Sequence, residues 1–454
     1  MGIKTTLPPE LKYHALVIEE KAREYGLEFF DVVFELLDAR DVNGIAAYGG
    51  FPVRYPSWRF GMEFEKLQRG YSWGMSKIYE LVINNDPTYA YLVRSNSLLE
   101  QKLVMAHVYG HADFFRNNVW FAGTERRMLD RMAHDATRVR RMIDAHGQET
   151  VEKRLDDMLS LEALVDPYLS RVAQPDLAPR RSLSEHRGLR LENFGRDASS
   201  TPAPVRAVFP EADVLGYLVR EAPLEDWERE LLEIVRAEAY YFLPQRLTKV
   251  ANEGWACYWH SKILTGGLLD ASEIIDFADV HSGATAAAPG QFNPYRLGLR
   301  LFRYAEALGH DLFMLRRIHN DVSLIDALVD ERFALEYHGA SESDALAARG
   351  QGFDWKAWKE GLLASLTFGG QPRITLVGRD VEGHGELVLE HHHDGRDLQL
   401  GQAGETMKRL ASVWGAPVHL ATRVDDEPCT VVATADTVDV RNGTEGPAEQ
   451  AQAS

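Results

Sequence analysis

Residues 104–111 read VMAHVYGH, and they place His107 and His111 four positions apart in a stretch whose apolar spacing predicts a helix. Side chains four apart lie about 40° apart around a helix, so both imidazoles project the same way and can share one cation. Zinc hydrolases use this spacing, but they carry a glutamate after the first histidine, and here that position is Val108. The stretch leaves three readings open: a metal site, a disabled one, or two histidines on a packing face.

A second stretch, NEGWA at residues 252–256, supplies a third candidate ligand. Glu253 would complete a His, His, Glu set for a divalent metal, zinc, with the fourth position open as catalytic zinc requires. Gly254 would let the two helices approach closely, at a cost of about 1 kcal/mol relative to alanine. His260 shares a helix face with Glu253 and is a candidate fourth ligand, a substrate contact or a partner behind the ligands. The alternatives are an ordinary salt bridge for Glu253 and a helix start at Gly254.

A hydrolase also needs a proton acceptor beside the metal-bound water, and valine cannot be one. Glu238, in the helix before Glu253, is the candidate base, with a structural carboxylate as the alternative. Candidate substrate contacts are His281, at the head of a Gly/Pro-containing loop, Tyr109 and Arg59, with a histidine in a helix-terminating turn as the alternative for His281. If the chain has no base, the metal is structural or the site binds without cutting.

The composition excludes some classes of partner and compartment. The chain of 454 residues has 68 acidic and 50 basic residues and a formal charge of −18, which disfavours nucleic acid and anionic lipid. Only two cysteines occur, which favours a reducing compartment. No signal peptide and no run of about 18 apolar residues is evident, so we expect a cytoplasmic protein without membrane insertion.

The apolar patterns predict a mainly α protein with a small β-sheet and a small α+β C-terminal domain. The candidate ligands on two of the helices add a zincin-like helical metal-binding core. Helical spacing extends over residues 29–36 and 63–85, and the alternation in TYAYLVRS at 88–95 predicts a strand. The expected division is a core at 1–345 with a mobile insertion at about 173–208, an α+β domain at 355–440 and a disordered tail at 441–454.

Three long stretches carry a family resemblance. Residues 55–118, which include YPSWRFGMEFEKLQRGYSWG and HVYGHADFFRNN, resemble the SpoVR family, the stage V sporulation protein R-like proteins. So do EAYYFLPQRLTKVANEGWACYWHSKIL at 238–264 and HSGATAAAPGQFNPYRLG at 281–298. The resemblance implies a bacterial cytoplasmic protein, linked in spore formers to spore cortex formation. Elsewhere it implies a role in stress or stationary phase beside a serine protein kinase and a von Willebrand A-like protein, but it implies no biochemical activity.

Two functions from different classes follow. The first is a metal-dependent hydrolase that cuts an amide bond of a peptide or cell-wall precursor, with residues 88–95 as an edge strand that pairs with an extended substrate. The second is a non-catalytic regulatory protein whose metal holds helices together and whose surface binds a partner such as the kinase.

Overall fold

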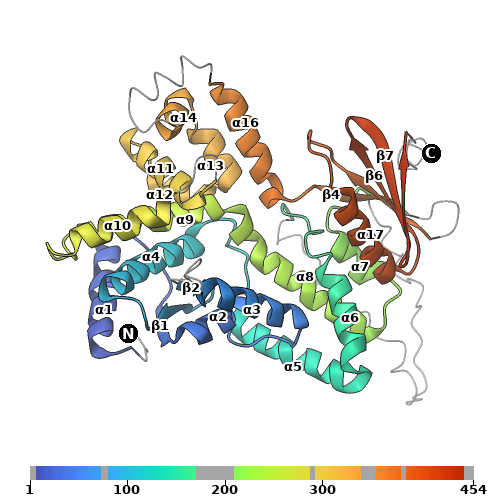
Figure 1. Cartoon of the computed structure of the whole chain (residues 1–454), viewed down its shortest axis with the longest axis horizontal. Coiled ribbons are helices and arrows are strands. Elements are labelled where there is room, and N and C mark those ends of the chain that lie inside the picture. The colour runs from blue at the N-terminus through green and yellow to red at the C-terminus, as the bar shows by residue number, and fades with distance from the viewer. Residues whose placement is uncertain are drawn as a thin grey trace, which may run out of the picture. The chain divides into compact units, whose positions relative to one another are not determined.

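The computed structural model describes residues 7–72, 80–169, 209–286, 292–338, 353–379 and 385–443. The chain divides into two compact units (Figure 1). We call residues 1–156 and 233–371 the helical unit, and residues 157–232 and 372–454 the sheet unit. The predicted insertion at 173–208 lies outside the described residues, as does most of the predicted tail.

The helical unit contains most of the helices and one sheet. Its elements are α1 (Pro9–Glu24), β1 (Val32–Leu37), α2 (Ala39–Ala47), α3 (Trp58–Ser72), β2 (Glu80–Ile83), β3 (Thr88–Val93), α4 (Leu98–Asn117), α5 (Met128–His146), α9 (Lys249–Thr265), α10 (Ile274–Thr285), α11 (Pro294–Ala307), α12 (Leu312–Ile318), α13 (Asp321–Leu328), α14 (Glu331–His338), α16 (Trp355–Leu366) and the 3-10 turn η3 (Thr367–Gly370). The division between the units falls within α6 (Gln148–Leu159) and α8 (Asp226–Leu247).

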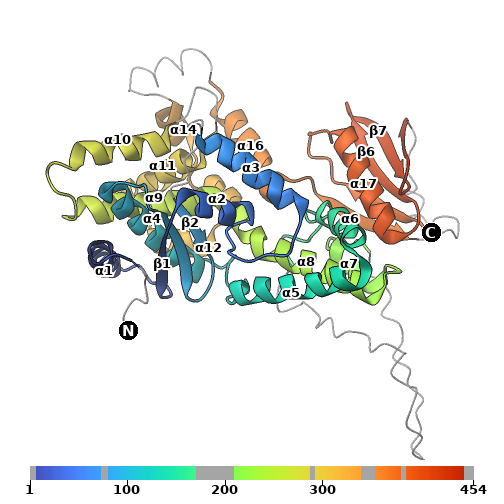
Figure 2. The same cartoon turned by 60° about the horizontal axis from the view of Figure 1, so that its bottom comes forward.

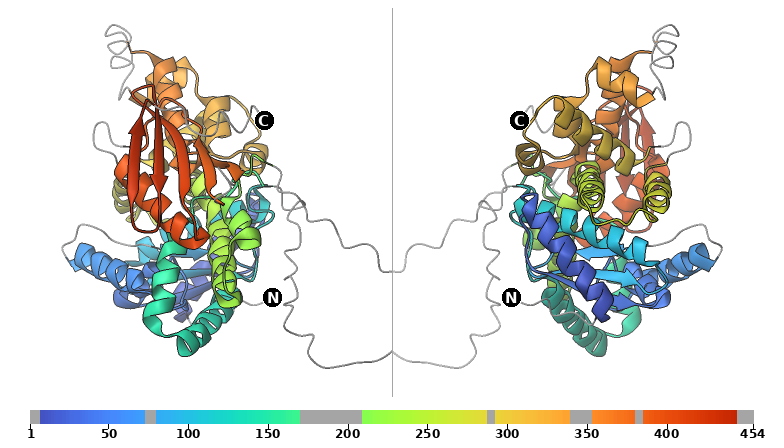
Figure 3. Two further views of the ribbon diagram at one scale, coloured as in Figure 1. Left: turned by 90° about the vertical axis from the view of Figure 1, so that its right-hand side faces the viewer. Right: turned by 90° about the vertical axis from the view of Figure 1, so that its left-hand side faces the viewer.

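Helix α4 is the central element of the helical unit. It starts at a capping box, in which the Ser97 hydroxyl accepts from the Glu100 amide and the Glu100 carboxylate accepts from the Ser97 amide. Nearly all of its residues between Leu99 and Phe115 are buried, which is typical of a helix surrounded by protein. Helices α1 and α9 pack against it (Figure 3, right-hand view).

Glycines set the spacing of α4, α9 and α11. A Cβ atom on Gly110 would lie 2.7 Å from Cα of Ala256, and one on Gly254 would lie 2.3 Å from Cα of Gly298. Both distances are too short for an alanine at the present helix separation. A close helix approach was predicted at Gly254; the structure places that glycine against Gly298 of α11, whereas α4 approaches α9 where Gly110 meets Ala256.

The helical unit holds a three-stranded sheet in the order β1-β3-β2 (Figure 2). Strand β3 runs parallel to β1 and antiparallel to β2, and it confirms the strand predicted at 88–95. Both of its edges are paired, so the expected role of this segment as an edge strand for substrate is wrong. The helical expectation is also wrong for residues 32–36, which belong to β1, and for 80–83, which form β2.

The described residues of the sheet unit form five strands and two helices of its own. They are α7 (Val214–Glu221), β4 (Ile374–Arg379), β5 (Leu387–His391), α17 (Leu400–Trp414), β6 (Val418–Val424), β7 (Glu427–Ala433) and β8 (Val438–Asn442). The strands follow the order β4-β5-β6-β7-β8, and β5 and β6 are the parallel pair (Figure 3, left-hand view). Helix α17 packs on β6, β7 and β8.

The sequence-based division and the two units differ at two places. Residues 157–232 group with the C-terminal strands, although the sequence analysis placed them in the core. Helix α16 groups with the helical unit, although the sequence analysis placed it in the C-terminal domain. Among the described residues, no helix combines the length and hydrophobicity needed to cross a bilayer.

Candidate metal centre

His107 and His111 lie on one buried face of α4, with their ring centroids 4.6 Å apart. Nδ1 of His111 lies 3.0 Å from Oδ1 of Asn252. Because an amide oxygen only accepts, Nδ1 of His111 carries the proton and its Nε2 keeps a lone pair. Asn252 therefore fixes the tautomer in which Nε2 can bind a cation.

Glu253, from α9, faces both rings. Its Oε2 lies 3.5 Å from Nε2 of His107 and 3.4 Å from Nε2 of His111. These separations are too long for good hydrogen bonds, and the buried Oε2 makes none with the described residues. Two atoms bound to one tetrahedral zinc ion at ~2.0–2.1 Å lie roughly 3.3–3.4 Å apart. The three atoms are thus spaced as ligands of one shared ion.

The electrostatics favour an ionised Glu253. Burial by itself raises the pKa of this carboxyl, but His111 and His107 outweigh burial and hold the pKa below its usual value. The ionised, buried carboxylate carries a negative charge, and a divalent cation held between it and the two rings would compensate that charge.

A row of three histidines runs from His107 through His260 to His281. Nδ1 of His107 lies 2.8 Å from Nδ1 of His260, and Nε2 of His260 lies 2.8 Å from Nδ1 of His281. Burial lowers the pKa of His260 well below its usual value and that of His281 to about 4, so both rings are neutral at pH 7. If His107 binds through Nε2, its Nδ1 donates to His260, which in turn donates to His281, and each ring keeps one proton.

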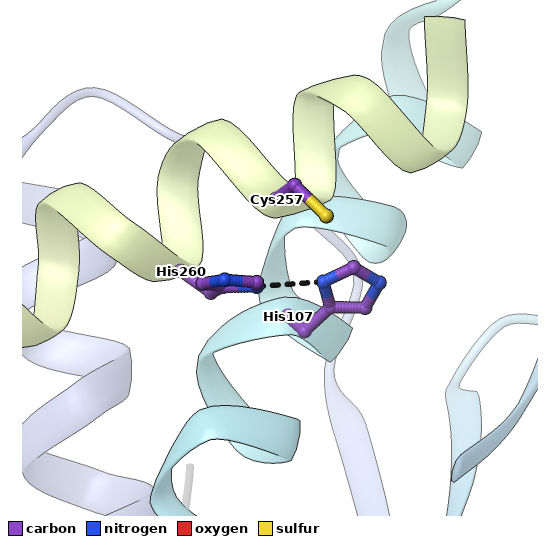
Figure 4. A group of neighbouring side chains, drawn as sticks. All are labelled: His107, Cys257 and His260. Atoms are coloured by element: carbon purple, nitrogen blue, oxygen red, sulfur yellow. Dashed lines mark hydrogen bonds between the residues drawn. The ribbon is translucent and has the colours of Figure 1, made fainter. Parts of the chain in front are cut away.

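Cys257 and His260 form a second group with His107, and Figure 4 shows the Cys257 sulfur on the side of His107 that faces His260. The 2.8 Å between the two Nδ1 atoms is a hydrogen-bond distance, shorter than the roughly 3.3 Å between two ligands of one ion. We therefore take His107, His111 and Glu253 as the candidate site. His260, predicted as a fourth ligand, lies behind His107 and contacts its other nitrogen.

Asp321 fixes the start of α9, and the sequence analysis missed it. Its carboxylate oxygens accept from the amides of Val250 and Ala251 at 2.9 and 2.8 Å, whereas the N-cap residue Thr248 makes no capping bond with its side chain. A side chain that accepts from the free amides at a helix N-terminus stabilises the first turn. Asp321 is 71 residues from Val250, so local sequence spacing carries no sign of this cap.

Asp113 connects the helices on the other side. Its Oδ2 accepts from the Trp255 indole at 2.8 Å and lies 3.1 Å from Nε of Arg316, and its Oδ1 accepts from the Glu28 amide at 2.8 Å. Asp113 follows His111 by two residues, and Trp255 follows Glu253 by two. The bond therefore fixes the relative position of the segments that carry the candidate ligands.

Three predicted residues have their contacts elsewhere. Glu238, the candidate base, is buried and accepts from Arg54 and, at 2.8 Å, from the Tyr55 hydroxyl. The hydroxyl of Tyr109 donates to the carbonyl of Ala15 at 3.2 Å, and its ring lies in the core. Arg59 bonds to the Asp156 carboxylate and backbone. Of the predicted residues, the structure brings together His107, His111, Glu253, His260 and His281.

The fold and the site define a class: a mainly helical protein in which two central helices direct two histidines and a glutamate to one point. The chain belongs to the SpoVR family, because the family model described as SpoVR like protein matches residues 6–371. The model described as SpoVR-like C-terminal domain matches residues 372–425 and begins where the sheet unit resumes.

One relative covers nearly the whole chain. Uncharacterized protein YcgB of Escherichia coli (strain K12) is 26% identical over 467 residues, which cover 90% of this chain and 91% of YcgB. No solved structure matches the chain.

Proposed function

We propose that this SpoVR protein binds a divalent cation, zinc, in a zincin-like core through Nε2 of His107, Nε2 of His111 and the Glu253 carboxylate. One observation carries the proposal: Oε2 of Glu253 lies 3.4 and 3.5 Å from the two Nε2 atoms, a spacing suited to ligation and too long for hydrogen bonding. The tautomer that Asn252 imposes on His111 supports it.

We propose further that the site is hydrolytic and that its substrate is an amide bond of a peptide or cell-wall precursor. Three protein ligands leave one position of a tetrahedral ion for water or a substrate carbonyl, and zinc there supplies a Lewis acid and a water of lowered pKa. The chain's own residues hold the ligands: Asn252 orients His111, and His260 orients His107. Residue 108 supplies no base, and Glu238 is engaged by Arg54 and Tyr55.

The second candidate is a metal-stabilised regulatory protein without catalysis, which acts with a serine protein kinase. The burial of the ligands favours it, because His107 and His111 are only 4% and 5% exposed, as in structural metal sites. The family resemblance adds a proposed biological setting, spore cortex formation or a stationary-phase response, for either candidate.

Metal analysis of the purified protein tests the site. We expect about one zinc per chain in the wild type and a large loss in Glu253→Gln, which keeps the shape of the side chain but removes its charge. Glu65→Gln, at an exposed residue that pairs with Arg69, is the matched control and should keep the metal. A wild-type protein that binds no zinc would refute the proposal.

Activity of the zinc-loaded protein separates the two candidates. Peptides and cell-wall fragments are incubated with the wild type and with Glu253→Gln, and products are followed by mass spectrometry. Cleavage by the wild type alone supports the hydrolase. Zinc binding without cleavage, together with a large loss of thermal stability on chelation, supports the regulatory protein.

A further inference from the structure

The helical unit contains a cavity of about 600 Å³ that includes none of the candidate metal ligands. It lies where the C-terminal end of α4 meets the turn after α1 and the start of α12. Its volume is within the range of small-ligand sites, roughly 300–1,000 Å³. Its lining is formed by Gly26, Glu28, Arg116, Asn117, Asp311, Phe313, Met314, Arg316 and Arg317.

Arg316 is a built part of this cavity, because it is only 6% exposed. Its Nε lies 3.1 Å from the buried Asp113 carboxylate, and its guanidinium carbon lies 5.4 and 5.3 Å from the ring centroids of Trp255 and Phe313. Its backbone carbonyl accepts from the Asn118 side chain at 2.7 Å. Among the described residues, the two Nη groups of Arg316 make no hydrogen bond, so their donors are available to a ligand in the cavity.

Four further charged residues line the cavity besides Arg316, which is paired with Asp113. They are the cations Arg116 and Arg317 and the anions Glu28 and Asp311. Arg116 donates one bond to the carbonyl of Phe29, and Asp311 accepts the amide of Met314. Within the described part of the chain, Arg116, Arg317, Glu28 and Asp311 form no ion pair with each other. Unpaired charges of both signs in one cavity are complementary to a ligand that carries both signs.

Beside Gly26 and the polar Asn117, whose amide donates to the carbonyls of Glu28 and Asp113, the rest of the lining is apolar. Phe313 is partly buried, and Met314 is 48% exposed. A methionine and an aromatic ring at the edge of a charged cavity can cover an apolar side chain of a ligand.

We propose that this cavity binds a short peptide with free termini, a di- or tripeptide zwitterion. The peptide carboxylate would take the guanidinium groups of Arg316 and Arg317, because a guanidinium fork matches a carboxylate. The ammonium group would face Glu28 and Asp311, and an apolar side chain would lie on Phe313 and Met314. A phosphate ion suits the cavity less well, because both lining carboxylates would repel it.

Calorimetric titration with L-alanyl-L-phenylalanine tests the proposal, with mass spectrometry to check that the peptide stays intact. We expect saturable binding that weakens at least about 10-fold when the peptide is N-acetylated and also when its carboxylate is converted to an amide. Inorganic phosphate should not compete.

Variants locate the site. Arg317→Gln and Glu28→Gln should each weaken binding of the free dipeptide about 10-fold, and both leave the buried Arg316 pair in place. Arg300→Gln, an exposed arginine of α11 outside the cavity, is the control and should bind as the wild type does. Absence of dipeptide binding, binding indifferent to both blocking groups, or binding unchanged in both cavity variants would each overturn the proposal. Phosphate binding without dipeptide binding would also overturn it and would assign the cavity to simple anions.

Discussion

At the scale of single residues, the candidate centre depends on which nitrogen of each imidazole is protonated. Asn252 accepts from Nδ1 of His111, and His260 contacts Nδ1 of His107, so the outer contacts are made at Nδ1 and leave Nε2 toward Glu253. Partners of this kind raise the basicity of a ligand and hold its ring in place.

Asn252 gives the first prediction. Asn252→Ala removes the acceptor for His111 and should weaken zinc binding about 10–100-fold. Asn252→Asp restores an acceptor and should bind within a few fold of the wild type. Competition with a chromophoric chelator measures both affinities, and equal affinities in the alanine variant and the wild type would contradict the role given to Asn252.

Asp321 gives a prediction about pH. Burial raises its pKa from 3.8 to about 7, despite the hydrogen bonds from Ala251 and Val250. The folded state therefore holds a proton that the unfolded state has released, so the contribution of Asp321 to stability is complete below about pH 4 and is lost as the pH rises through 7. Asp321→Ala should thus destabilise the protein more at pH 6 than at pH 8.

Urea unfolding of the wild type and of Asp321→Ala at the two pH values measures this difference. Asp326→Ala, at an exposed residue of the same helix, serves as the control for loss of an aspartate and should have only a small effect on stability. A destabilisation by Asp321→Ala that grows between pH 6 and pH 8 would contradict the expected direction.

At the scale of elements, the separation between α9 and its neighbours is set by glycines. Alanine is the better helix former by about 1 kcal/mol, so a glycine in an unobstructed helix is expected to gain stability on substitution. Gly254 is obstructed, because an added Cβ would lie 2.3 Å from the Gly298 backbone.

Gly254→Ala should therefore destabilise the protein, by about 1–3 kcal/mol, despite its better helix propensity. It should also weaken zinc binding, because residue 253 would shift with the helix. Gly361→Ala in α16, where an added Cβ meets no atom within 4 Å, should be neutral or stabilising. Thermal unfolding of both variants tests this, and a stabilised Gly254→Ala would contradict the packing account.

The elements that could be predicted from the sequence are those in which the spacing of apolar residues follows the buried face of the element itself. The helix of His107 and His111 and the strand at 88–95 were both predicted from local spacing. A close approach was also predicted at Gly254, but its neighbour there is Gly298 of α11 and not the histidine helix. The helix predicted at residues 29–36 was wrong, because apolar positions in the strand β1 also fit a helical stripe.

The site was less predictable wherever the partners are far apart in sequence. Asp321 reaches Val250, and Arg54 engages Glu238 from 184 residues away. The sequence could not show that Glu238 lies outside the candidate metal centre, because its carboxylate accepts hydrogen bonds from residues that only the tertiary fold brings close.

At the scale of the whole molecule, the sheet unit is built from two separate segments. The backbones of Glu211 and Leu376 exchange two hydrogen bonds of 2.8 Å, and Asp157 accepts from Arg409 and Ser412 at 2.9 Å. Asp157 and Glu211, from the first segment, therefore take hydrogen-bond partners from the C-terminal segment.

Truncation after Gln371 should leave α7 without the residues that cover it, including Trp414, which packs on Tyr217. We expect the truncated chain to expose apolar surface and to bind more of a hydrophobic dye, while it still binds zinc through the helical unit. If the truncated chain keeps the helical circular-dichroism signal but no longer binds zinc, the claim that the metal centre does not need the sheet unit would be contradicted.

X-ray absorption at the zinc edge of the zinc-loaded protein tests the central claim most directly. The account predicts only nitrogen and oxygen neighbours at ~2.0–2.1 Å, with the outer scattering of two imidazoles. A sulfur neighbour at ~2.3 Å would instead put the metal at Cys257, and the assignment to His107, His111 and Glu253 would be contradicted.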